Sequence, residues 1–269
     1  MPWLTCFVSI SIFNISLPYV KQFSRKEPSL FFLKAVNPKT MSVYVIADLH
    51  LSHGADKPMD VFGAKWENHT EKLRENWLKT VSQEDTVVIV GDISWGLRFE
   101  NAVDDLAFIH SLPGKKIISK GNHDFWWQSA KKLREYKEAS GADSIEFLYN
   151  NAFYAEGIIF CGTRGWTDEA SASEKDKKII SREAGRLSLS MAQAQALKEE
   201  YPEGEIISFV HFPPTQSLTD IMRENGVRKC YYGHLHGAHR DTLPQHINGI
   251  EVHLVSADFI NFCPVKIKE

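Results

Sequence analysis

The 269-residue sequence lacks several patterns that define common protein classes. It has no Cys-x-x-Cys pair, and its four cysteines are widely spaced, which argues against a zinc knuckle or a disulfide scaffold and favours a reducing compartment. Positive charge is not concentrated either, because 31 Lys and Arg stand against 34 Asp and Glu and no basic run exceeds a pair. Surfaces that bind nucleic-acid phosphates concentrate Lys and Arg. We therefore expect no long nucleic acid as a partner.

A clear export signal or membrane span is also missing. Residues 4–20 are apolar but are interrupted by serine, asparagine and proline, and no Lys or Arg precedes Lys21. A signal peptide needs a positive start, and a membrane span needs about 20 continuous apolar residues. We therefore interpret residues 1–40 as a non-core extension of a domain over residues 41–269, and expect a cytoplasmic protein without stable membrane insertion. The alternative is an export signal or interfacial anchor in residues 1–40, which would make the protein exported or membrane-associated.

Strand and helix patterns alternate along the chain from residue 41. Runs such as 43–46 and 87–90 have the length and the branched side chains of buried strands. Residues 68–81 repeat apolar side chains every four positions, as an amphipathic helix does. Residues 174–201 predict one or two helices, with Ser190 as the cap of the second. No repeat or low-complexity linker divides this pattern, so we expect a single α/β domain.

Polar motifs follow several of these strands. In chain order they are Asp48-x-His50, Gly91-Asp92, Gly121-Asn122-His123-Asp124, His211 and Gly233-His234-Leu235-His236. Because polar groups beyond the strand ends of open α/β sheets meet in one crevice, we expect these side chains to converge. Carboxylates, an amide and imidazoles without a thiolate suit Mn, Fe, Zn or Co better than Ca. Each motif alone is weak, but five in order predict a site for two divalent metal ions.

The five motifs resemble those of the calcineurin-like metallophosphoesterase superfamily over residues 43–260, and the second and third look like those of a bacterial phosphohydrolase branch. The resemblance implies an α/β fold of four layers, α/β/β/α, in which helices flank two mixed sheets. It also implies two ligand sets that share Asp92 as a bridge. The first metal would be held by Asp48, His50, Asp92 and His236, and the second by Asp92, Asn122, His211 and His234.

The resemblance further implies a dinuclear metal-dependent phosphoesterase. Two divalent ions about 4 Å apart bind the phosphoryl oxygens and lower the pKa of a shared water toward 7, which provides hydroxide for attack on phosphorus. The catalytic side chain would be His123, which stabilises the charged phosphoryl group or protonates the leaving oxygen. For Asp124 we expect one of three roles: orienting that imidazole, facing solvent or capping the next helix.

The chain departs from one branch of the superfamily. Protein Ser/Thr phosphatases carry a second Asp and an Arg shortly after the bridging Asp, where this chain has Trp95 and Gly96. We therefore expect a small phosphomonoester or phosphodiester substrate, nucleotide-like compounds included, rather than a phosphoprotein. The alternative function is a catalytically silent scaffold that binds protein partners, but such a protein would be expected to lose ligands or His123. A nuclease for polymeric DNA would need a basic groove that the composition does not show.

Several residues near these motifs are candidates for substrate contacts. Arg164 can fork onto a phosphate, although a surface ion pair explains it equally well. Arg182 and Arg186 predict either a cap over the site or pairing with carboxylates. Aromatic residues near the motifs either stack on a base or aryl group or fill the core, and we favour packing for at least half of them: Trp95, Phe125, Trp126, Trp127 and Trp166. Three further residues adjoin the ligand motifs: His53, His239 and Arg240.

Overall fold

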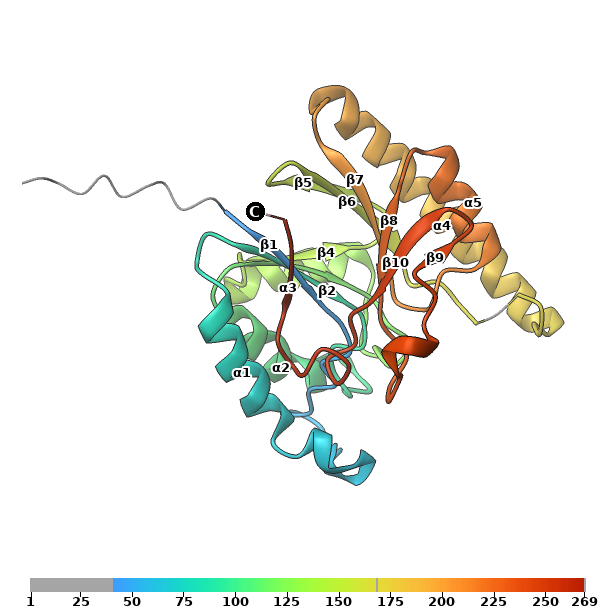
Figure 1. Ribbon diagram of the computed structural model, residues 1–269. Coiled ribbons are helices and arrows are strands. Elements are labelled where there is room, and N and C mark those ends of the chain that lie inside the picture. Colours follow the sequence, from blue (N-terminus) through green and yellow to red (C-terminus); the bar gives the residue numbers. More distant parts are fainter. Residues whose placement is uncertain (1–40, 168, 269) are drawn as a thin grey trace, which may run out of the picture. The chain divides into compact units, whose positions relative to one another are not determined.

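The computed structural model describes residues 41–167 and 169–268 (Figure 1). The interpretation of residues 1–40 as an extension lies outside the described residues and stays a prediction. Within the described part, two mixed sheets are each covered by helices on one face, so the expected α/β/β/α layers are confirmed. Among these residues, none of the helices combines the length and the apolar character that crossing a bilayer requires.

The first sheet has five strands in the order β11-β1-β2-β3-β4. Four of them are parallel, and only β11 is antiparallel to its neighbour. The strands are β1 (Val43–Ile46), β2 (Thr86–Val90), β3 (Lys115–Ser119), β4 (Ile145–Leu148) and β11 (Val265–Lys268). Its outer face packs against α1 (His69–Thr80), α2 (Phe99–Ser111) and α3 (Ala130–Ser140). The helix predicted over residues 68–81 is therefore confirmed.

The second sheet has six strands in the order β5-β6-β7-β8-β10-β9, with antiparallel strands at both edges. The strands are β5 (Ala152–Ala155), β6 (Ile158–Thr163), β7 (Glu205–Val210), β8 (Lys229–Tyr232), β9 (His246–Ile247) and β10 (Ile250–Leu254). Its outer face is covered by α4 (Glu174–Glu200) and α5 (Gln216–Glu224). Short 3-10 helices occur at η1 (Asp60–Phe62), η2 (Ala64–Trp66) and η3 (Arg240–Thr242).

The two sheets bury their inner faces against each other. One apolar cluster joins Val45 and Val88 of the first sheet to Phe160 and Phe209 of the second. Both faces of the central strands are therefore dry, which explains why they read as continuous apolar runs rather than alternating ones. The same arrangement brings the ends of β1, β2 and β3 near the ends of β7 and β8, as the contacts described below show.

Of the two alternatives for residues 174–201, a second helix capped by Ser190 is wrong and the single helix is confirmed, because α4 is one helix of 27 residues. Ser190 is buried in its middle, where the hydroxyl donates to the carbonyl of Asn151 and accepts from the amide of Gly162. A serine that bonds to neighbouring strands has no need to cap a helix. The true cap is Ser173, which forms a capping box with Asp176.

Candidate metal centre

The polar motifs of the two sheets meet at the ends of their strands. Nε2 of His211, after β7, lies 3.3 Å from Oδ2 of Asp92, after β2, and 2.7 Å from Oδ1 of Asn122, after β3. Nδ1 of His234, after β8, lies 2.9 Å from the same Asn122 oxygen. Asp48, after β1, accepts the backbone N–H of His234 at 2.9 Å. Residues separated by up to 186 positions therefore share one site.

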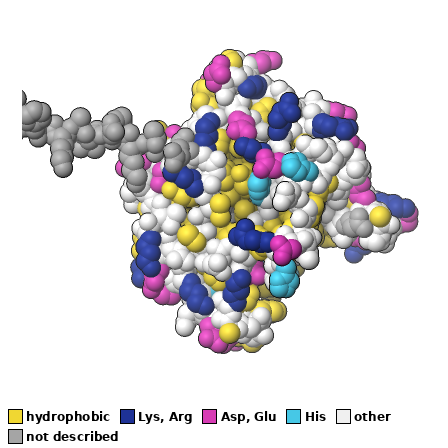
Figure 2. All heavy atoms as spheres, viewed as in Figure 1, with side chains coloured by type: hydrophobic (Ala, Val, Ile, Leu, Met, Phe, Trp, Pro, Cys, Tyr) yellow, Lys and Arg dark blue, Asp and Glu magenta, His cyan; other side chains and the backbone are white. Residues whose placement is uncertain are grey.

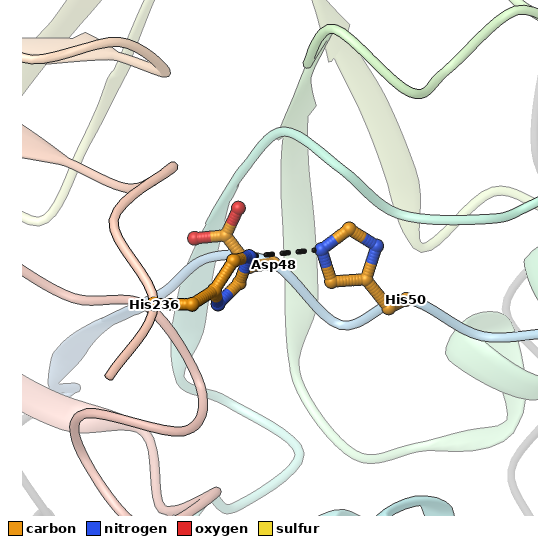
Figure 3. A group of neighbouring side chains, drawn as sticks. All are labelled: Asp48, His50 and His236. Carbon is orange, nitrogen blue, oxygen red and sulfur yellow. Dashed lines mark hydrogen bonds between the residues drawn. The ribbon is translucent and has the colours of Figure 1, made fainter. Parts of the chain in front are cut away.

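Two groups of side chains present their ligand atoms within 4.8 Å of one another. The first contains Asp48, His50 and His236, whose arrangement is drawn in Figure 3. The second contains Asp48, Asp92 and His211. Nε2 of His50 is also 3.8 Å from Oδ2 of Asp92, which places that carboxylate between the two histidines. All seven predicted ligands are thus in one continuous cluster.

The cluster fits a cation better than it fits a hydrogen-bonded core. Oδ1 of Asp48 is buried and has no hydrogen-bond partner among the described residues, although buried polar atoms almost always have one. The Nε2 atoms of His50 and His236 face each other at 3.2 Å (Figure 3). Mixed oxygen and imidazole donors of this kind suit divalent transition metals.

Hydrogen bonds fix which nitrogen two of the histidines, His211 and His236, offer to the cluster. Nδ1 of His211 lies 3.0 Å from the carbonyl oxygen of Val90, so this nitrogen carries a proton and Nε2 faces the cluster. Nδ1 of His236 lies 2.9 Å from Oδ1 of Asp258 and again leaves Nε2 facing the cluster. Partners of this type set the tautomer and the ring orientation of metal-binding histidines.

Burial and nearby charge set the protonation states. Burial lowers the pKa of His50 to about 3 and that of His234 to about 4, so both are neutral at neutral pH, which is the form that binds metals. Burial alone would raise the pKa of Asp92, but the neighbouring His211 and His50 outweigh it and hold the pKa below its usual value. The pKa of His211 is raised, because the attraction of Asp92 and Asp48 exceeds the effect of burial.

The backbone is strained where the ligands project. Asp48, His50, Asp92 and His234 have positive φ values of 58°, 47°, 50° and 72°, in the left-handed region that residues other than glycine rarely adopt. Such conformations cost about 1–3 kcal/mol each and persist only where the surrounding structure imposes them. Four of the seven predicted ligands have this conformation, which is common among active-site residues.

Two glycines allow the strand ends to approach closely. A Cβ atom at Gly121 would lie 2.1 Å from Oδ1 of Asp92, and one at Gly233 would lie 2.5 Å from Oδ2 of Asp48. Any side chain at either position would displace a carboxylate of the cluster. The glycines that adjoin the ligand motifs are therefore part of the site.

The family model of calcineurin-like phosphoesterases matches residues 41–238. The chain belongs to this family. It is similar, at 32% identity over 83 residues, to the Gene 66 protein of Mycobacterium phage L5, and at 36% over 84 residues to that of Mycobacterium phage D29. Each match covers 31% of this chain and 40% of the phage protein, so the chain spans less than half the length of these relatives.

Among solved structures, the chain is similar to Phosphopantetheinyl Hydrolase (PptH) from Mycobacterium tuberculosis, with a TM-score of 0.51 and 12% identity. The likeness covers 85% of this chain and 96% of that one. At this identity it supports the fold, which agrees with the two sheets described above.

His123 lies beside the ligand cluster, as predicted. Its backbone N–H donates to Oδ1 of Asp92 at 2.8 Å, and its ring centroid is 4.5 Å from that of Trp95 and 5.7 Å from that of His50. The ring lines a cavity of about 550 Å³ together with His50 and His236. Burial lowers the pKa of His123. A half-buried imidazole at the mouth of the cluster can contact a bound phosphoryl group.

The three roles expected for Asp124 are wrong. Its side chain is fully buried and accepts the backbone N–H groups of Ile93, Ser94 and Gly121 and the indole N–H of Trp126. The carboxylate therefore ties the loop after β2 to the loop after β3. The sequence did not reveal this role because it depends on two loops that meet only in the folded chain.

Arg164 forms an ion pair, as its alternative interpretation predicted, but the pair is largely buried rather than on the surface. Its guanidinium lies 3.2 Å from buried Glu183 and above the ring of Trp166. Its carbonyl accepts the backbone N–H of His211 at 3.0 Å, so it adjoins the ligand cluster through its backbone. Arg186 also pairs with Glu183, at 2.6 Å, which confirms carboxylate pairing for this helix. The contact of Arg164 with substrate stays a prediction.

The other candidates for substrate contacts differ in their surroundings. Of the five aromatic candidates, Trp126 and Trp127 are buried in the core, Trp95 packs against that core and also lines the cavity, and Phe125 is exposed. His53 is held by buried Asp105, 2.7 Å from its Nδ1. Arg240 lies over the ring of Phe259.

Two kinds of residue were missed. Asp258 orients His236 from the turn after β10, and the aromatic residues Phe62 and Trp66 line the cavity from η1 and η2. Neither lies beside a ligand motif in the sequence.

Proposed function

We propose that this chain is a dinuclear metal-dependent phosphoesterase that hydrolyses small phosphomonoesters or phosphodiesters. The observation that carries the proposal is the convergence of seven potential ligands near a buried oxygen of Asp48 that has no hydrogen-bond partner among the described residues, with His123 beside them. Asp48, His50, Asp92 and His236 would hold one ion, and Asp92, Asn122, His211 and His234 the other. The retention of every ligand and of His123 argues against the silent scaffold.

The residues of the proposed site have different roles. Divalent ions, when bound, neutralise phosphoryl oxygens and make water nucleophilic at neutral pH, and Mn, Fe, Zn or Co suits the donors. Asp92 bridges the two ligand sets, and Asp258 and the carbonyl of Val90 hold the histidines in the required tautomer. His123 would stabilise the charged phosphoryl group or protonate the leaving oxygen. Arg164 is retained as a candidate phosphate contact.

The surface supports a small substrate. The cavity of about 550 Å³ beside the cluster is of the size that small ligands occupy. On the face shown in Figure 2, basic and acidic side chains are interspersed rather than gathered into a basic stripe. Long nucleic acid is therefore not the proposed substrate.

Two further inferences accompany the enzyme proposal. The family match begins at residue 41, which supports residues 41–269 as the catalytic domain and residues 1–40 as an extension. Cys161 and Cys230 are buried and unpaired, which supports a cytoplasmic location.

The test uses the full chain, stripped of metal and resupplied with Mn²⁺. We expect hydrolysis of aryl phosphate monoesters or diesters that depends on the metal and that Asp92→Asn or His123→Ala abolishes. Matched controls are Asp143→Asn and His246→Ala, which change exposed residues of the same types and should leave the rate unchanged. Turnover that survives both active-site substitutions would contradict the assigned roles.

A further inference from the structure

We infer that the cavity beside the ligand cluster binds a planar aromatic group carried by the ester substituent of the substrate. This inference rests on the proposed phosphoesterase function and narrows its substrate class. The residues that line the cavity include His50, His123 and His236 together with Phe62, Trp66 and Trp95. A phosphoryl group bound at the histidines would therefore direct its substituent between aromatic side chains.

Two indole rings contact the metal-binding histidines directly. Trp95 stacks on His50, with ring centroids 4.9 Å apart and an interplanar angle of 21°. Trp66 meets His50 and His236 edge-on, with centroids 5.8 Å and 5.5 Å away. The aromatic walls therefore adjoin the proposed reaction centre.

The side chain of Lys57 lies over two of the aromatic rings that line the cavity. Nζ of Lys57 lies 4.9 Å from the ring centroid of Trp95 and 5.4 Å from that of Phe62. Cations and ring edges are both attracted to the negative face of an aromatic ring, whereas a saturated group gains only contact area. This electrostatic preference favours an aromatic occupant over an alkyl one.

Phe62 is exposed at the edge of the cavity. Its side chain is 55% exposed, although Trp66, four residues later, is buried. A bound ring would cover the apolar surface of Phe62 that the chain leaves in water. Phe125 is also exposed, but it is not among the residues that line the cavity.

The test compares two substrates that differ only in the ring. Phenethyl phosphate and cyclohexylethyl phosphate have the same carbon skeleton and the same primary alkoxide leaving group, so kcat/KM reports the interaction with the ring. For the Mn²⁺-loaded full chain we expect a preference of about 2- to 10-fold for the phenyl compound. Phe62→Leu should reduce this preference while retaining an apolar side chain. Val61→Ala, at an exposed neighbour that does not line the cavity, should keep it.

A binding measurement separates this inference from the enzyme proposal. Calorimetry with phenethylphosphonate and cyclohexylethylphosphonate measures the ring preference without turnover. Preferred binding of the phenyl compound, weakened in Phe62→Leu, would support the inference even if neither phosphate were hydrolysed, a result that would contradict only the phosphoesterase proposal. Equal or weaker binding of the phenyl compound, or a preference unchanged in Phe62→Leu, would overturn the aromatic site even if both phosphates were hydrolysed.

Discussion

Asp258 holds His236 in place from a turn that no ligand motif marks. Its Oδ1 lies 2.9 Å from Nδ1 of His236, and its Oδ2 accepts the backbone N–H of Gly237 at 2.9 Å. Both contacts fix the loop that follows β8, and the first leaves Nε2 of His236 facing His50. Asp258 is thus a positioning residue for the proposed metal site.

Replacing Asp258 with alanine should weaken metal binding. Loss of a carboxylate that orients a metal-binding histidine typically lowers affinity about 10- to 100-fold. Titration calorimetry of the metal-free full chain with Mn²⁺ measures this effect, and Asp241→Ala, which removes an exposed aspartate nearby in sequence, is the control. Unchanged Mn²⁺ affinity in Asp258→Ala would show that His236 needs no such support.

The sequence predicted those parts of the site that lie at strand ends. Asp48, Asp92 and His211 follow apolar runs, and parallel strands bring their ends to one edge of a sheet. The four-layer fold came from the family resemblance of these same motifs, because local patterns do not say how two sheets pack.

Other features depend on contacts between distant segments. Asp258 reaches His236 across 22 positions, and the left-handed backbone at His50 reflects the surrounding loops rather than a local preference of histidine. Trp66 lies in a short 3-10 helix far from any motif, so its place in the cavity had no sequence signal. Serine is a common helix cap, so Ser190 was predicted to be one. The sequence does not show its hydrogen bonds to β6 and Asn151, which hold it in the middle of α4.

Asp124→Ala should destabilise the fold. Four N–H donors, three from the backbone and one from Trp126, would lose their acceptor in a buried place. Each unsatisfied buried donor costs about 1–3 kcal/mol, so the free energy of unfolding should fall by about 3 kcal/mol or more. Urea unfolding measures it against Asp143→Ala, an exposed control. A loss as small as that of the control would mean that the loops rearrange to satisfy these donors.

Glu183→Gln should also lower the free energy of unfolding, because it leaves Arg164 and Arg186 without their carboxylate partner. Glu183 is 1% exposed and pairs with Arg164 and Arg186, whose side chains are 14% and 27% exposed. Removing the charge of one partner from a buried ion pair costs about 3 kcal/mol. Glu174→Gln, at the exposed start of α4, makes the same chemical change without that loss and serves as the control in thermal or urea unfolding. Equal stability of the two variants would show that the arginines reach water when Glu183 is neutral.

We expect the buried Lys116 to make the free energy of unfolding rise with pH. Its buried ammonium donates to the carbonyl groups of His110, Leu112 and Gly114, and burial lowers the pKa of Lys116 to about 8 from its usual 10.5. Between these values the unfolded chain keeps the proton that the folded chain has lost. The unfolded state then binds more protons, so the contribution of this lysine to the free energy of unfolding increases with pH.

Lys116→Met removes the titrating ammonium. The difference in the free energy of unfolding between this variant and the unchanged chain therefore reports the titration of Lys116 and not that of other groups. We expect the stability of the unchanged chain relative to Lys116→Met to grow as the pH rises from about 8 to 10.5, measured by urea unfolding at each pH. Lys115→Met changes the exposed neighbour and should show no such trend relative to the unchanged chain. A difference between Lys116→Met and the unchanged chain that stays constant over this range would mean that the three carbonyl groups keep the pKa of Lys116 near its usual value.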